Sequence, residues 1–149
     1  MPEKYKKKVF VSGGAGVIGT ALVNVLIRQG CLVLTGDLKP CPEEWKNLPQ
    51  LTYRQGDLIS MTALEIAKFA PEIYFHLAAT FERSEETAGF WEENFHHNVH
   101  LSHHLMTLTK DLPSIQKIIF ASSYLLYDPQ LYLFPTPKTI LCHYQRTLQ

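Results

Sequence analysis

Residues 8–19 read KVFVSGGAGVIG and carry the strongest structural signal in this chain. They begin with a short, mostly apolar run that ends at glycines, which predicts a buried strand at residues 8–12. Apolar residues at helical spacing follow between Ala21 and Leu26, and Gly30 is a typical residue at a helix end. The pattern therefore predicts a strand, a tight glycine turn and a helix.

Three glycines form the pattern G-x-x-G-x-x-G between this predicted strand and helix. Backbone without side chains lets a pyrophosphate approach closely, and a helix N-terminus directs N–H groups and the positive end of its dipole at the phosphates. In this context the pattern predicts a dinucleotide-binding turn. The residues assigned to it are Gly13, Gly16, Val17, Ile18 and Gly19.

Further apolar segments read as strands, and helical segments alternate with them. Continuous apolar strands that alternate with helices predict a parallel sheet covered on both faces. The expected fold class is α/β, a Rossmann-type doubly wound parallel sheet of about five strands. We expect one NAD-binding domain over residues 1–127 and an irregular tail over 128–149. The expected strands are 8–12, 31–35, 51–53, 73–77 and 117–121, and the later helices are 63–69 and 91–110.

Composition and charge narrow the classes of function. The chain has 149 residues with 14 basic and 14 acidic side chains, so its net charge of zero argues against nucleic acid or an anionic membrane as a partner. Residues 9–27 are uncharged, but their glycines and polar side chains make them too polar for a membrane span. Three widely spaced cysteines fit neither a disulfide framework nor a metal motif, which predicts a reducing, cytoplasmic location.

Two aspartates follow predicted strands. Asp37, after the second strand, has the spacing at which an acidic residue accepts hydrogen bonds from the adenosine ribose and repels a 2′-phosphate. It therefore favours NAD over NADP, and Lys39 weakens that preference. Asp57, after the third strand, is expected to accept from the adenine amino group, with Leu58 lining the pocket. Local capping of a turn is the alternative role for Asp57.

Five short motifs occur in a fixed order along residues 8–127. They are VSGGAGVIG at 11–19, GDL at 56–58, FHLAA at 75–79, NV at 98–99 and FASS at 120–123. In this order the chain resembles the extended short-chain dehydrogenase/reductases, and among them the NAD-dependent epimerases and dehydratases that act on nucleotide sugars.

The resemblance implies a role for each matched residue. One group would hold NAD, and a single serine would orient the sugar substrate. By position, Asp57 and Leu58 would contact adenine, Leu77, Ala78 and Ala79 the diphosphate and ribose, Asn98 would buttress the central helix near the cofactor, and Ser123 would be the catalytic serine.

The family's next motif, Tyr-x-x-x-Lys, has no counterpart here, because no tyrosine is followed by lysine four positions later. In the family this tyrosine exchanges a proton with the substrate, and the substrate-binding region follows it. We therefore expect the N-terminal, NAD-binding portion of an epimerase or dehydratase, truncated relative to the family and without efficient turnover by itself. A non-catalytic dinucleotide-binding sensor or scaffold and an inactive fragment remain as alternatives.

Histidines gather on one face of the predicted helix 91–110. We expect this face to be solvated or to face a second subunit, and by resemblance the helix would contribute to a homodimer. Apolar residues on the other face are expected to pack on the sheet. The histidines are His96, His97, His100, His103 and His104, and the apolar residues are Trp91, Phe95, Val99 and Leu105.

Among these histidines, His96, His100 and His104 are spaced four residues apart, as metal ligands on helices often are. We expect only adventitious metal binding by them and no dedicated metal site. His76 is different, because it lies inside the fourth predicted strand between apolar neighbours. The expected role of His76 is that of a hydrogen-bonded core residue.

Overall fold

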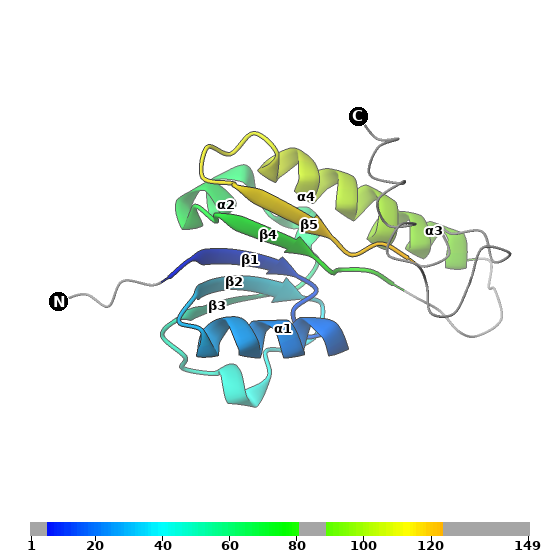
Figure 1. Ribbon diagram of the computed structural model, residues 1–149. Coiled ribbons are helices and arrows are strands. Elements are labelled where there is room, and N and C mark those ends of the chain that lie inside the picture. Colours follow the sequence, from blue (N-terminus) through cyan, green and yellow to red (C-terminus); the bar gives the residue numbers. More distant parts are fainter. Residues whose placement is uncertain (1–5, 81–88, 124–149) are drawn as a thin grey trace, which may run out of the picture.

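A computed structural model describes residues 6–80 and 89–123 (Figure 1). Within these residues the chain forms one five-stranded sheet with the strand order β3-β2-β1-β4-β5, and every neighbouring pair is parallel. The predicted doubly wound α/β fold is thereby confirmed. The strands are β1 Lys8–Ser12, β2 Leu32–Asp37, β3 Leu51–Gln55, β4 Ile73–His76 and β5 Lys117–Phe120.

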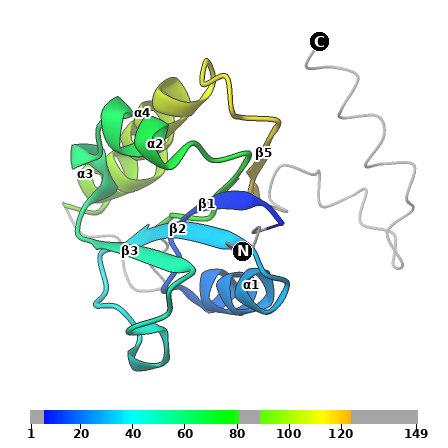
Figure 2. The same ribbon diagram turned by 90° about the vertical axis from the view of Figure 1, so that its left-hand side faces the viewer.

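Helices cover both faces of this sheet, with α1 on one face and α2, α3 and α4 on the other (Figures 1 and 2). Short 3-10 turns at Glu43–Trp45 and Leu58–Ser60 lie in the connections. None of the helices in residues 6–80 and 89–123 is long and apolar enough to cross a membrane. The α-helices are α1 Val17–Arg28, α2 Ala63–Phe69, α3 Phe90–Asn94 and α4 Leu101–Thr109.

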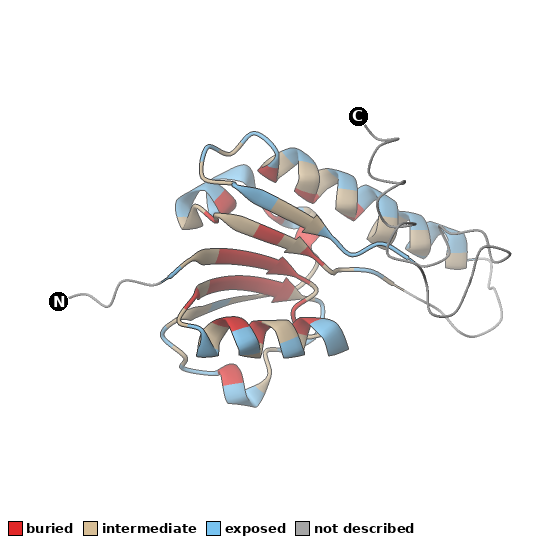
Figure 3. Cartoon of the chain, in the orientation of Figure 1, coloured by how far each residue is buried: buried red, intermediate tan, exposed pale blue. Residues whose placement is uncertain are grey.

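The central strand β1 is buried along most of its length (Figure 3), and its apolar side chains belong to both layers of the core. Val9 and Val11 are fully buried on the side where Val23 of α1 packs. Phe10, between them in sequence, is fully buried on the opposite side and stacks on Tyr74 with ring centroids 4.6 Å apart. Side chains of a strand alternate between its faces, so a run that is apolar at every position produces a core on each side.

Strands β2 and β3 are longer than the sequence pattern predicted. Glycine at position 36 was expected to end the second strand, but Gly36 pairs with Arg54 and Asp37 pairs with Gln55. Parallel pairing with β3 satisfies the backbone groups beyond the apolar run, so the strands continue to Asp37 and Gln55. Asp37 therefore belongs to the sheet and is positioned by its hydrogen bonds.

The predicted helix 91–110 consists of three parts, because a π-helical turn, Phe95–His100, separates α3 from α4. The expected apolar face was partly wrong. Leu105 is fully buried, whereas Trp91, Phe95 and Val99 are 65%, 61% and 50% exposed. The buried residues of α4 are Leu101, Leu105 and Thr109, which follow helical spacing. One turn before Leu101, the same face of the helix carries positions 97 and 98, so polar residues face the sheet there.

His76 lies at the centre of a buried hydrogen-bond network that joins β1, β4 and α4. Its Nδ1 is 2.9 Å from the Ser12 hydroxyl and 2.7 Å from the Tyr74 hydroxyl, and its Nε2 is 2.7 Å from Ser102 Oγ. Ser102 donates to the Asn98 carbonyl, so its oxygen accepts from the His76 Nε2–H and Nδ1 is the acceptor. The interpretation of His76 as a hydrogen-bonded core residue is confirmed.

Burial lowers the pKa of His76 from 6.5 to about 4. The unfolded chain therefore takes up a proton at a higher pH than the folded chain, so the free energy of unfolding falls as the pH drops between about 6.5 and 4. We expect His76 to account for a loss of about 3 kcal/mol across this window. In urea unfolding at several pH values, the free energy of unfolding of His76→Gln should fall less steeply with decreasing pH than that of the wild type. An equal dependence on pH in the two proteins would contradict the assignment.

Candidate functional site

A cleft opens at the carboxyl ends of the strands, where the order of the sheet reverses between β1 and β4. Ligands of open α/β sheets bind at this kind of position. Eight of the residues assigned from the sequence line the cleft: Gly13, Gly16, Asp37, Asp57, Leu58, Leu77, Ala78 and Ala79. Lys39, which the sequence placed near Asp37, also lines it. Six further lining residues were not assigned to this site from the sequence, namely Gly36, Leu38, Gly56, Thr80, His97 and Leu101.

The glycine turn is packed too tightly to accept side chains. Gly13 has φ of +77°, and a Cβ there would lie 2.7 Å from the backbone nitrogen of Ala78. A Cβ on Gly19 would overlap the Gly13 carbonyl oxygen. These contacts place the start of α1 directly beside the ends of β1 and β4, so the turn is fixed before any ligand binds.

The N-terminus of α1 faces the cleft, and no side chain in the described part of the chain caps it. Gly16 is the N-cap residue, no side chain caps the helix, and no acidic residue lies in its first turn. Val17 and Ile18 are 92% and 68% exposed. The backbone N–H groups at the start of the helix are therefore available to an anion such as a diphosphate.

Asp37 connects the end of β2 to the glycine turn. Its Oδ2 accepts a hydrogen bond of 3.0 Å from the backbone N–H of Ala15, and its Oδ1 accepts one of 3.0 Å from the N–H of Lys39. Tyr53 lies nearby, and burial together with the charge of Asp37 raises the pKa of its phenol to about 12. Each carboxylate oxygen has a second lone pair, so Asp37 can still accept from a ribose hydroxyl.

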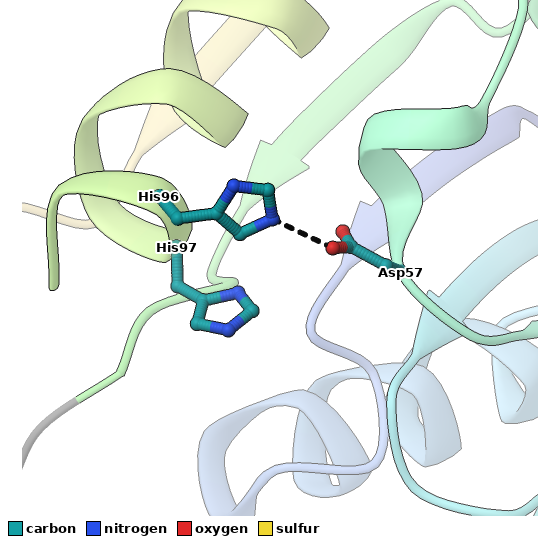
Figure 4. A group of neighbouring side chains, drawn as sticks. All are labelled: Asp57, His96 and His97. Atoms are coloured by element: carbon teal, nitrogen blue, oxygen red, sulfur yellow. Dashed lines mark hydrogen bonds and ion pairs between the residues drawn. The ribbon is translucent and has the colours of Figure 1, made fainter. Parts of the chain in front are cut away.

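Asp57 has both the capping role that was left open and a partner that the sequence did not indicate. Its Oδ1 accepts from the Ile59 N–H at 3.0 Å, and its Oδ2 is 2.7 Å from His96 Nε2 (Figure 4). Burial would raise the pKa of Asp57, but the hydrogen bonds from His96 and Ile59 outweigh it, so the pKa is lowered. The aspartate is held as a carboxylate at the edge of the cleft.

The histidine face of the π-turn and α4 is not one solvated surface. His96 and His97 are half-buried beside Asp57, and His104 is 2.9 Å from the Met61 carbonyl oxygen. His100 and His103 are exposed, as expected. The expectation of a fully solvated face therefore does not hold for the other three, since Asp57 and Met61 approach the helix and supply oxygen acceptors to His96 and His104. The alternative that the stripe faces a second subunit stays a prediction.

Asn98 braces the segment that follows β4. Its side-chain oxygen accepts from the Thr80 N–H at 2.7 Å, and its side-chain nitrogen donates to the Thr80 carbonyl at 2.8 Å. The paired hydrogen bonds hold the backbone after Ala79 against the π-turn. Asn98 thus holds Thr80, a residue that lines the cleft, in position through hydrogen bonds to its backbone.

Ser123 is exposed in the segment after β5 and is not among the residues that line the cleft. Tyr127 and the expected tail at 128–149 fall outside the described residues. The residues that line the described part of the cleft come from five segments that are far apart in the chain, 13–16, 36–39, 56–58, 77–80 and 97–101.

Comparison with known proteins gives consistent results. The model of the NAD dependent epimerase/dehydratase family matches residues 9–145. A dTDP-glucose 4,6-dehydratase of Neisseria meningitidis is 29% identical over 135 aligned residues, which cover 82% of this chain and 38% of the relative. The chain therefore spans well under half the length of this relative.

Two solved structures extend the comparison. The epimerase Mth375 of Methanothermobacter thermautotrophicus superposes with a TM-score of 0.73 at 22% identity, over 91% of this chain and 40% of its own. MoeE5, solved in complex with UDP-glucuronic acid and NAD, superposes with a TM-score of 0.60 at 28% identity, over 78% of this chain and 36% of its own.

The packing at Gly19 predicts a large cost for a single methyl group. Gly19→Ala is expected to lower the free energy of unfolding by about 3 kcal/mol, because the new Cβ overlaps backbone that cannot move away. Gly89→Ala is the matched control, since a Cβ there meets nothing within 4 Å, and it should change stability by no more than about 0.5 kcal/mol. Equal costs in urea unfolding would contradict the close packing.

Proposed function

The chain belongs to the NAD dependent epimerase/dehydratase family, and we propose that it is the NAD-binding portion of an enzyme that acts on a nucleotide sugar. The observation that carries the proposal is the meeting of the glycine turn, the uncapped start of α1 and the Asp37 carboxylate at one cleft. A diphosphate needs close backbone approach and N–H groups, and a ribose needs an acceptor, and these three features supply both.

Each part of the cleft suits a different part of NAD. Gly13, Gly16 and the first turn of α1 would hold the diphosphate, with Val17 and Ile18 beside it. Asp37 would accept from the adenosine ribose, and Asp57 and Leu58 would lie at the adenine. Leu77, Ala78 and Ala79, which the Asn98 clamp supports, would line the opposite wall. When bound, NAD supplies reversible hydride acceptance from a substrate carbon.

The geometry at Asp37 supports NAD over NADP. A 2′-phosphate would bring two negative charges close to a carboxylate that is fixed by the backbone of Ala15 and Lys39. Among the described residues that line the cleft, Lys39 is the one lysine or arginine, and its side chain would offset part of that repulsion.

The substrate class is proposed from the relatives. One relative is named a dTDP-glucose 4,6-dehydratase, and one structural neighbour was solved with UDP-glucuronic acid. Both compounds are sugars attached to a nucleoside diphosphate. Ser123 follows β5 in the motif shared with the family, and we assign it the task of orienting that sugar. A non-catalytic NAD-binding sensor or scaffold remains the second candidate, favoured by the lack of Tyr-x-x-x-Lys among these 149 residues.

Two properties of the whole protein are also proposals. Cys31 and Cys41 are free thiols, which suits a reducing cytoplasm. Trp91, Phe95 and Val99 form an exposed apolar row on α3 and the π-turn, and burying such a row would favour a homodimer through this helix.

Calorimetric titration tests cofactor choice. The wild type should bind NAD about tenfold more tightly than NADP, and Asp37→Asn should remove that difference because it removes the charge while an amide oxygen can still accept from Ala15. Asp111→Asn, at a side chain that is 85% exposed, is the control and should leave both affinities unchanged. A folded chain without saturable NAD binding would overturn the proposed function.

Turnover separates the two candidates. We expect the 149-residue chain with NAD to produce no NADH signal and no new sugar when given UDP-glucose or dTDP-glucose, since proton transfer needs a group of suitable pKa at the substrate. Addition of a Tyr-x-x-x-Lys segment by extending the reading frame should restore turnover for an enzyme. Continued inactivity of a folded, NAD-binding extended protein would favour the sensor or scaffold.

A further inference from the structure

Three potential metal ligands meet at the edge of the cleft. Asp57 caps the 3-10 turn that follows β3, and His96 and His97 belong to the π-turn (Figure 4). One ligand atom from each residue can be chosen so that all three atoms lie within 4.8 Å of one another. His96 and His97 thus form a group with Asp57 that helical spacing along the sequence did not indicate, because Asp57 lies 39 residues before His96.

We propose that Asp57, His96 and His97 bind one divalent transition-metal ion of the zinc class. Zinc takes imidazole nitrogen and carboxylate oxygen at about 2.0–2.1 Å, so neighbouring ligand atoms in a tetrahedral site lie about 3.3 Å apart. The separations here bracket that value, from 2.7 Å between His96 and Asp57 up to the limit of 4.8 Å. Small side-chain rotations would therefore complete three ligands, with a fourth position open to water.

The π-turn explains how two consecutive residues can serve one ion. Successive side chains of an α-helix point about 100° apart, which normally separates neighbours. Here the rings of His96 and His97 have centroids 4.8 Å apart at an angle of 83°, and both lie on the side of the helix that faces Asp57 (Figure 4). Single π-turns inside helices occur frequently at functional sites.

Access and charge also suit an ion. The side chains of His96 and Asp57 are 39% and 32% exposed, so an ion can enter from solvent without unfolding of the chain. One carboxylate would offset half the charge of a divalent cation. The histidine set that the spacing suggested, His96, His100 and His104, does not converge in the same way, because His104 is bound to the Met61 carbonyl.

Cobalt titration of the full chain without NAD tests the site directly. Visible absorption should report one site with nitrogen and oxygen ligands, and zinc should displace the cobalt. His97→Ala should weaken binding at least about tenfold, since one of three protein ligands is lost. His103→Ala is the matched control, because His103 is an exposed histidine on the same helix outside the group, and it should bind as the wild type does.

Three results would overturn the site: no saturable binding, equal weakening by the two variants, or a thiolate-to-cobalt absorption band. Thermal unfolding in the presence of a chelator checks that each variant folds as the wild type does. His97→Gln is the second variant if the alanine fails that check, because glutamine keeps a polar side chain at this half-buried position.

A consequence rests on the proposed function, since Asp57 and His97 also line the cleft. Metal and NAD should compete, so saturating zinc should reduce the apparent NAD affinity of the wild type and change that of His97→Ala much less. Equal reductions would mean that zinc acts elsewhere and would overturn the competition. Failure of NAD binding would be evident in the metal-free titration, and failure of the metal site in the titration without NAD.

Discussion

Backbone packed against backbone at the glycine turn holds the cleft end of this molecule together. Gly13 touches the backbone of Ala78, and Gly19 touches the carbonyl of Gly13, with no room for a Cβ at either position. Because of this contact the ends of β1 and β4 and the start of α1 occupy one place. The hydrogen bond from Ala15 to Asp37 adds the end of β2, so the start of α1 and the Asp37 carboxylate are both held in place.

The opposite wall of the cleft depends on polar contacts made by the helix that runs from α3 to α4. Asn98 clamps Thr80, and His96 bridges to Asp57. Buried and half-buried polar groups must be paired, and here the pairs join segments that are distant in sequence. Ser102, next to them, receives the His76 N–H, which ties the same helix to the centre of the sheet.

Much of the cleft could be predicted from the chain, and the misses have a common cause. Gly13, Gly16, Asp37 and Asp57 were indicated because each follows a strand in a parallel sheet, and the ends of such strands meet. His97 was named only as one histidine of a helix face, because nothing in the sequence linked it to the cleft. The pairing of His96 with Asp57 was missed because only the folded chain brings their segments together. The apolar face of the helix was misassigned at Trp91, Phe95 and Val99, where polar partners attract the other side of the helix.

Local pattern alone determined the order of strands and helices, the glycine turn and the choice of Asp37, since each depends on neighbours in the chain. Tertiary structure decided which face of the helix turns inward, where the π-turn lies and which partner each histidine finds. These outcomes depend on the loop after β3 approaching a helix that begins more than thirty residues later in the chain. Contacts of that kind have no periodicity in the sequence, so only the packed fold reveals them.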